Sequence, residues 1–191
     1  MHRAPRFAGV VVGLFLMGAA AAQQVPGSQD QSVAKAKQAE DQLDFNSAIH
    51  WYEKAAEAGS AESMNELGWI YFGAHDIPGR QLKDYSKAVI WFQKAADLNY
   101  MPAITQLGIM YGADGSFGVP EDQVKASQLF LKAAQAGDAQ AMNQLGVRYM
   151  RGKGVPRDIN QAIQWWKKAA AEGGQPGKAA QTWLDVYSSR Q

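Results

Sequence analysis

The stretch AMNQLGVRYMRGKGVPRDINQAIQWWKKAAAEG, residues 141–173, decides the fold of this chain because its pattern also occurs upstream. Its first part has the spacing small-x-x-x-Leu-Gly-x-x-Tyr, which occurs around Leu67, Leu107 and Leu145, 40 and then 38 residues apart. A fixed period of about 20 to 50 residues indicates a repeat architecture. The sequence therefore predicts an array of similar helical units.

A second pattern alternates with the first and completes the repeating unit. Its frame is Asp-x-x-x-Ala-x-x-(Trp/Leu)-x-x-Lys-Ala-Ala, and its copies begin at Asp44, Asp84, Asp122 and Asp158. An Asp at a helix start accepts bonds from unpaired backbone amides and contributes about 1 kcal/mol. Apolar residues three and four apart then share one face of the helix. Residues suited to a left-handed backbone are expected to end these helices: Gly59, Asn99, Gly137 and Gly173.

The Gly that follows each Leu of the first pattern stands inside a predicted helix. Gly in a helix interior costs roughly 1 kcal/mol relative to Ala, so Gly68, Gly108 and Gly146 need a packing reason. We expect them to be positions of close contact with the partner helix. The tryptophans of the second pattern are expected to lie mostly in the repeat core: Trp51, Trp91, Trp165 and Trp166.

The repeats also define the domain organisation. Residues 44–173 carry the complete frames, and residues 32–43 are expected to form a degenerate first helix. Residues 177–188 keep the spacing but have Leu in place of Gly, as suits a C-terminal cap helix whose outer face meets water. The sequence thus predicts an all-α solenoid over residues 32–191, after a flexible leader over residues 23–31.

The N-terminus has the three parts of a secretory signal. Two arginines precede an apolar run that ends in small residues, so residues 1–22 are predicted to be a signal peptide cleaved after Ala22. An uncleaved anchor is the alternative. The chain has no cysteine, which excludes disulfide stabilisation and a lipid-modified cysteine. We expect a periplasmic or secreted protein that is not embedded in the membrane after cleavage.

The two patterns together resemble the Sel-1-like repeat, a relative of the tetratricopeptide repeat. The unit with Leu145, Gly146, Tyr149, Asp158 and Trp165 matches it most fully, and the resemblance covers almost all of residues 44–173. It implies a right-handed α/α superhelix and an adaptor role. An exported branch of the family has been proposed to bind or hydrolyse β-lactams, but it is rich in paired cysteines. That activity is therefore not carried over to this chain.

The sequence offers little that could perform chemistry. After signal removal the histidines are His50 and His75, and each is interpreted as a surface residue. No motif of a hydrolase, a metalloprotease or a phosphate-binding loop is present. The sequence predicts no catalytic residue, no metal ligand and no cofactor. The recurring lysines of the second pattern have acidic neighbours, which indicates a solvated face rather than a nucleic-acid site.

A partner is expected on the concave wall, which the first helix of each pair lines in a solenoid. Successive residues of a helix are rotated by about 100°. Four positions therefore lie opposite the core stripe: those five and two residues before each Leu, and those two and five residues after it. We name these the track positions. They hold Glu62, Asn65, Trp69 and Phe72, then Pro102, Thr105, Ile109 and Gly112, then Gln140, Asn143, Val147 and Met150. Trp69 and Phe72 are the predicted anchors, and Arg148 and Arg151 a charged rim.

These features predict a monomeric, non-enzymatic binding protein of the bacterial envelope, with a protein or peptide as its partner. An immunity protein that caps a delivered toxin is one alternative. A scaffold that binds envelope components through its convex or loop surfaces is another, and a hydrolase without a recognisable motif is a third. Trp69 could instead pack against adjacent helices if the superhelix curls tightly.

Overall fold

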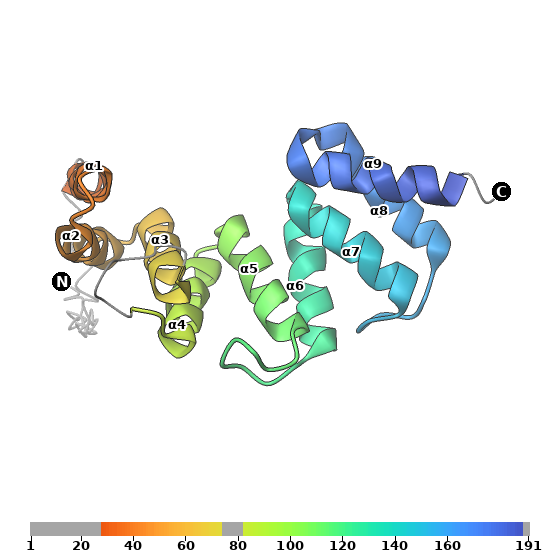
Figure 1. Cartoon of the computed structure of the whole chain (residues 1–191), viewed down its shortest axis with the longest axis horizontal. Coiled ribbons are helices and arrows are strands. Elements are labelled where there is room, and N and C mark those ends of the chain that lie inside the picture. The colour runs from red at the N-terminus through yellow and green to blue at the C-terminus, as the bar shows by residue number, and fades with distance from the viewer. Residues whose placement is uncertain (1–27, 74–81, 189–191) are drawn as a thin grey trace, which may run out of the picture.

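The computed structural model describes residues 28–73 and 82–188, and all regular structure in these residues is α-helical (Figure 1). The helices are α1 (Ser28–Asp41), α2 (Phe45–Glu57), α3 (Ala61–Phe72), α4 (Tyr85–Asp97), α5 (Met101–Gly112), α6 (Gln123–Gln135), α7 (Ala139–Arg151), α8 (Ile159–Glu172) and α9 (Gly174–Ser188). They pack mainly as the pairs α1–α2, α3–α4, α5–α6 and α7–α8, and α9 packs on the last pair. The expected all-α solenoid is confirmed.

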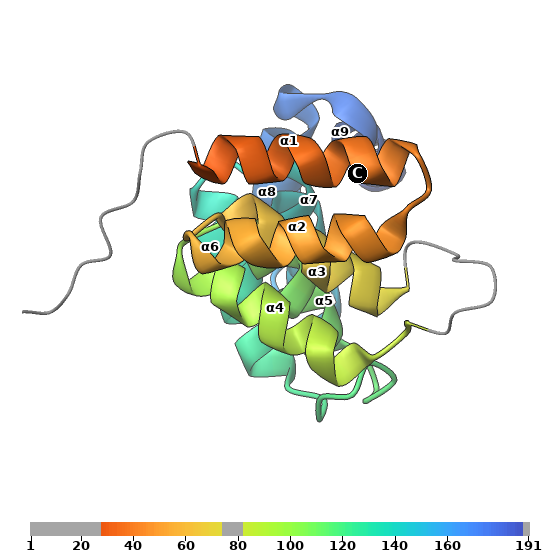
Figure 2. The same ribbon diagram turned by 90° about the vertical axis from the view of Figure 1, so that its left-hand side faces the viewer.

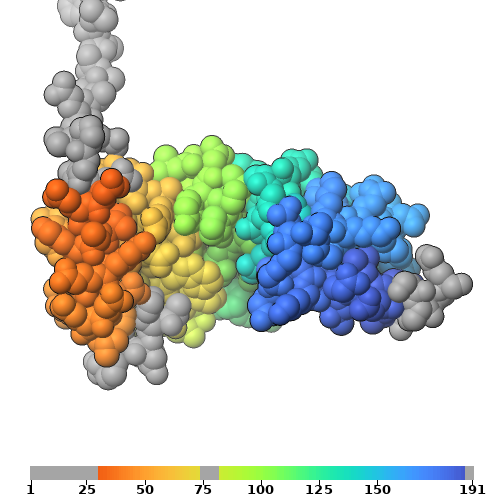
Figure 3. Space-filling model, turned by 90° about the horizontal axis from the view of Figure 1, so that it is seen from above, coloured from red at the N-terminus to blue at the C-terminus, as the bar shows by residue number. Residues whose placement is uncertain are grey.

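The pairs form an elongated row from α1 at one end to α9 at the other (Figure 3). Their direction rotates along this row. In Figure 1, α1 and α2 point toward the viewer while α8 and α9 lie across the view, and Figure 2 shows α1 and α2 lying side by side. Each inner pair contacts mainly its neighbours, so the core runs along the row as two clusters, one over α1–α3 and one over α4–α9.

The predicted helix starts are confirmed in every second-pattern helix. The side chains of Asp44, Asp84, Asp122 and Asp158 accept hydrogen bonds from backbone amides three residues on. The amide of each later Asp also donates to the carbonyl of the Tyr in the preceding first-pattern helix. These bonds are Asp84 to Tyr71 at 2.8 Å, Asp122 to Tyr111 at 2.8 Å and Asp158 to Tyr149 at 2.9 Å. One residue therefore begins the second helix and ties it to the first.

The Gly after each Leu is a close-contact position, as expected. A Cβ built on Gly68 would lie 2.6 Å from the Phe92 ring, and one on Gly108 would lie 3.0 Å from the Phe130 ring. A Cβ on Gly146 would overlap Trp166. All three ring residues are 0 or 1% exposed. The missing side chain thus lets a large aromatic ring from the second helix lie directly on the first.

The tryptophans differ in burial. Trp166 is fully buried, but Trp51, Trp91 and Trp165 are only half-buried, so the expectation that the series is mostly core is wrong for these three. The lysine three residues later covers each of their rings. The ammonium lies 4.8 Å from the ring centre for Lys54, 3.9 Å for Lys94 and 4.3 Å for Lys168. The recurring lysines therefore take part in cation–π contacts on the outer surface.

The ends of the row differ slightly from expectation. Helix α1 begins at Ser28, so residues 28–31 are helical and do not belong to a flexible leader. The C-terminal helix begins at Gly174, three residues before the predicted cap. The proposed signal peptide lies outside the described residues. None of the described helices combines the length and the apolar character that crossing a membrane requires.

Candidate functional site

The track positions do not form one exposed stripe. Asn65 and Thr105 are 4% and 2% exposed, so the expectation that they face solvent is wrong. The reason is that α3 packs against both α2 and α4, and α5 against both α4 and α6. More of each helix is therefore covered than a single partner helix could cover. Asn65 Oδ1 and Thr105 Oγ1 are buried without a hydrogen-bond partner among the described residues.

The predicted anchors Trp69 and Phe72 are half-buried in an aromatic cluster. Trp69 stacks edge-on against Phe92, with ring centres 5.5 Å apart, and against Phe72 at 5.6 Å. Phe117, from the loop between α5 and α6, lies 5.2 Å from Phe72 and 5.3 Å from Tyr85. The loop of one repeat thus packs on the preceding pair. We name this contact, made by Phe72, Tyr85 and Phe117, the aromatic junction.

Track residues of the next two repeats converge on one pocket. Ile109 and Gly112 of α5 and Val147 of α7 line a hollow of about 280 Å³, together with Arg148 and Arg151. Ile109 and Val147 are half-buried, and Arg151 is exposed. We name this hollow the Arg148 pocket. The structure therefore brings together predicted residues that are far apart in the sequence.

The remaining track residues lie elsewhere. Glu62 is paired with Lys37 of α1 at 2.8 Å, and both side chains are largely exposed. Gln140 is exposed at the start of α7 and Pro102 at the start of α5, while Asn143 and Met150 are half-buried. None of these five residues lines the Arg148 pocket.

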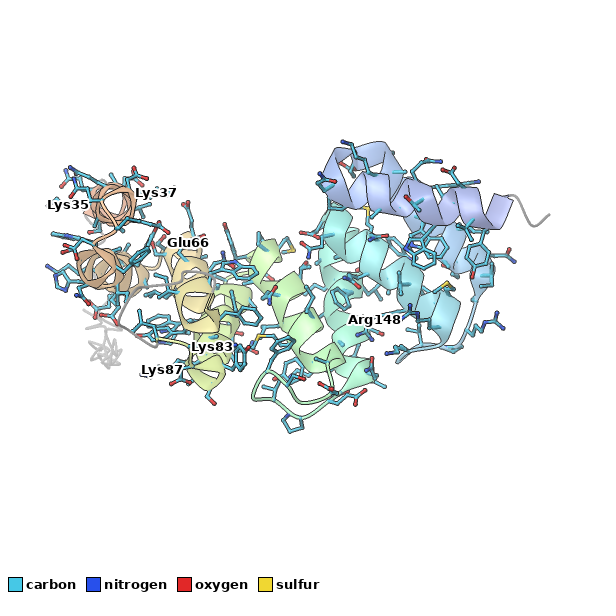
Figure 4. All side chains as sticks on the ribbon, in the orientation of Figure 1. Lys35, Lys37, Glu66, Lys83, Lys87 and Arg148 are labelled. Atoms are coloured by element: carbon cyan, nitrogen blue, oxygen red, sulfur yellow. The ribbon has the colours of Figure 1, made fainter. Side chains whose placement is uncertain are left out.

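Arg148, predicted to form a charged rim, is instead 7% exposed. Figure 4 shows it between α7 and α6. Its Nη1 donates to Gln123 Oε1 at 2.8 Å and to the Gln123 carbonyl and Ser127 Oγ at 3.2 Å each. The Lys153 carbonyl is a longer acceptor at 3.4 Å. Every one of these acceptors is a neutral oxygen.

The Arg148 guanidinium has no carboxylate partner among the described residues. Burial lowers the pKa of Arg148 from its ordinary value, and no acidic group offsets that effect. Arginine stays protonated despite such shifts, so the pocket contains a desolvated positive charge. A charge in this position is costly unless a counter-ion reaches it.

Gly112 provides the space for this guanidinium. A Cβ at Gly112 would overlap Arg148 Nη2, and the track position in the preceding repeat holds the large side chain of Phe72. The guanidinium carbon Cζ of Arg148 also lies 5.0 Å from the centre of the Phe130 ring, which stabilises the charge from one face.

Sequence reasoning missed the burial of Arg148, although a signal was present. The third residue after each Leu is Ile70, Met110 and Arg148 in the three repeats. The first two are 1% and 0% exposed. An alignment of the repeats would therefore have placed Arg148 at a core position.

Within residues 28–73 and 82–188, no group of three or more His, Cys, Asp or Glu side chains could hold a metal ion. His50 is exposed and stacks edge-on against Trp51. His75 lies outside the described residues.

Helix pairs that repeat the same Leu-Gly contact and stack in a row define the class of helical repeat proteins. The Sel1 repeat family model matches residues 40–60, 61–100, 102–138 and 139–174. This chain belongs to the Sel1 repeat family, as the resemblance indicated.

Solved structures show the same architecture. A Sel1 repeat protein from Oxalobacter formigenes is 29% identical with a TM-score of 0.66, over 76% of this chain and 59% of that one. The protective antigen c5321 of uropathogenic Escherichia coli is 36% identical with a TM-score of 0.60, over 68% and 26%. Helicobacter pylori cysteine-rich protein B is 27% identical with a TM-score of 0.50, over 66% and 91%.

A curated relative, rat DAP3-binding cell death enhancer 1, is 39% identical over 57 residues, which are 30% of this chain and 11% of that protein. The chain thus spans only part of this relative and of the first two structures. Sel1 repeat proteins are typically protein-interaction scaffolds.

Proposed function

We propose that this chain is a non-enzymatic binding protein of the bacterial envelope, which recognises a protein or peptide through the Arg148 pocket and the helix faces beside it. The supporting observation is the convergence of Ile109, Val147 and Arg151, from two successive repeats, on one pocket. Half-buried aliphatic residues beside a cationic edge are typical of interaction surfaces. The surface is made by α5 and α7, each of which packs against a helix on either side, so little ordering accompanies binding.

The proposed location rests on the sequence of the N-terminus. Residues 1–22 have the charge, the apolar core and the small-residue end of an export signal. A cysteine-free chain folds without oxidation, which suits an exported protein that relies on packing alone. The periplasm and the extracellular space both remain open destinations under this proposal.

The experiment is crosslinking of the full chain, expressed with its own N-terminus and an affinity tag, followed by identification of the captured proteins. The variant Ile109→Gln/Val147→Gln changes the pocket wall without changing charge. The matched control is Ile90→Gln/Val124→Gln, which alters residues that are each 55% exposed on α4 and α6. Trp69→Ala or Phe72→Ala would instead disturb the aromatic junction, since the Trp69 ring packs against Phe72 and the Phe72 ring packs against Phe117.

The proposal predicts one dominant partner that is captured by the natural chain and by the control but lost from the pocket variant. The partner's identity would separate an adaptor from an immunity protein. Capture that survives in the pocket variant and disappears in the control would place the binding surface on the second-pattern helices and contradict the proposal.

A further inference from the structure

The buried arginine occupies a position that is aliphatic in the other repeats. Ile70 and Met110 stand at the equivalent place and are 1% and 0% exposed, whereas Arg148 is 7% exposed. Helical packing alone therefore does not require a charge at this position. Replacing an aliphatic residue by a desolvated cation lowers stability unless another interaction compensates.

The surroundings of Arg148 have changed together with it. Where the aromatic junction has Phe72, Tyr85 and Phe117, the next junction has Gly112, Gln123 and Lys153. Gly112 leaves room for Nη2, and Gln123 and the Lys153 carbonyl accept from Nη1. Four positions, on three helices and one loop, thus form a site that holds a guanidinium.

The hydrogen bonds of the guanidinium leave one edge available. All four hydrogen bonds use Nη1, and neither Nε nor Nη2 donates to a residue in the described part of the chain. These two nitrogens form the edge at which an arginine can hold a carboxylate with two parallel hydrogen bonds. The Nη1 bonds fix the orientation of that edge.

The charge around the pocket has a single sign. Its lining includes Arg148, Arg151 and Lys153, and no acidic side chain lines it. The rest of the wall is apolar or neutral, with Ile109, Val147 and Phe130 among its members. Because several cations line the pocket and no acidic residue does, the pocket is complementary to a segment with several acidic residues rather than to one isolated carboxylate.

We propose that the Arg148 pocket binds a glutamate side chain from an acidic, partly apolar segment of the partner protein. This inference rests on the proposed function and specifies the chemistry of its partner. Glutamate is preferred over aspartate because the guanidinium is recessed and the longer side chain reaches it. Arg151 and Lys153 then meet neighbouring acidic residues, and Ile109 and Val147 contact the apolar ones.

The test is fluorescence anisotropy with a labelled peptide of alternating glutamate and leucine, blocked at both ends so that only side chains supply carboxylates. The comparison peptide has glutamine in place of every glutamate and a free C-terminal carboxylate. The proposal predicts at least about tenfold tighter binding of the glutamate peptide, weakening as salt is raised. Equal binding of both peptides, or no binding of the glutamate peptide, would overturn it.

Variants assign the binding to the pocket. Arg148→Gln is expected to weaken binding of the glutamate peptide about tenfold, and Arg151→Gln/Lys153→Gln about fivefold. Lys132→Gln is the control, since it removes the same charge from an exposed side chain outside the pocket. An Arg148→Gln chain that folds and binds as tightly as the natural chain would contradict the assignment.

A measurement on the natural chain avoids any dependence on the folding of Arg148→Gln. The NMR signal of the Arg148 Nε–H group is expected to shift during titration with the glutamate peptide and to stay unchanged with the glutamine peptide. An unchanged signal at saturating glutamate peptide would overturn the proposal. If this happened while Ile109→Gln/Val147→Gln still lost its partner, the proposed function would stand and only the glutamate assignment would fail.

Discussion

At the first junction between Leu-Gly repeats, Phe117 packs against Phe72 and Tyr85, whereas the same positions at the next junction hold Lys153, Gly112 and Gln123. The backbone arrangement is shared. In both cases the loop that leads into a second-pattern helix packs against the start of the previous second-pattern helix. Gly118 lies beside Tyr85 at the start of α4, and Gly154 lies beside Gln123 at the start of α6. The first junction is filled with aromatic rings, and the second leaves a cationic pocket.

The comparison separates positions that stack the repeats from positions that are free to vary. The Leu, the Gly after it, the capping Asp and the Tyr carbonyl make equivalent contacts in successive repeats. The residues where the loop meets the preceding pair change from rings to polar groups without altering that frame. A solenoid built this way can present different chemistry at each junction, because each repeat is stabilised mainly by its neighbours.

The largest expected effect comes from the glycine at the same loop position of the two junctions. Gly154 has φ +69°, and a Cβ there would overlap the Gln123 carbonyl. Gly118 has φ +72°, but a Cβ there would lie 3.3 Å from Tyr85 Cβ. We expect Gly154→Ala to lower the free energy of unfolding by roughly 3 kcal/mol and Gly118→Ala by roughly 1 kcal/mol. Urea denaturation measures both free energies of unfolding. Equal losses in the two variants would mean that the two loops approach the preceding helix equally closely, which would contradict this comparison.

A smaller effect is expected from the side chains of Phe117 and Lys153, which directly precede these two glycines. Phe117→Ala removes a half-buried ring with two aromatic neighbours and should cost about 2 kcal/mol. Lys153→Ala is the matched change at the second junction, where the exposed side chain makes no packing contact of this kind and the backbone carbonyl serves as acceptor. It should cost less than about 0.5 kcal/mol. Thermal unfolding of the two variants would contradict this order if Lys153→Ala proved the more damaging.

A small net effect is also expected from Arg148→Met, which copies the residue at the equivalent position of the second repeat. The change removes a desolvated charge but leaves Gln123, Ser127 and Lys153 with fewer donors. These effects oppose each other, so we expect a stability change within about 1 kcal/mol. A loss of more than about 3 kcal/mol in urea denaturation would show that Arg148 is required for folding, and the contrast with Met110 would then lose its functional meaning.

The parts of the fold that depend on one helix and its partner could be predicted from the sequence. The Asp caps, the left-handed helix ends and the contacts of Gly68, Gly108 and Gly146 follow from short-range rules and are present in the structure. Each involves residues whose spacing is fixed by the helix itself.

The candidate site was less predictable because it depends on how neighbouring repeats cover each helix. A helical wheel places Asn65 and Thr105 opposite the core stripe, yet both are buried because their helices pack between two others. The same wheel does not show that Phe117 packs against Phe72, since that contact comes from a loop of the next repeat. Ile109 and Val147, which the same wheel also places opposite the core stripe, are half-buried and line the Arg148 pocket.

The most direct test of the account is photo-crosslinking in cells from two single positions, one that lines the Arg148 pocket and one that is exposed outside its lining. A photoreactive residue at position 147, beside Arg148, is compared with one at position 124, on the exposed surface of α6. The account predicts a specific crosslinked partner from position 147 that is lost when Arg148→Gln is added, and none from position 124. A partner crosslinked from position 124 but not from position 147 would contradict it.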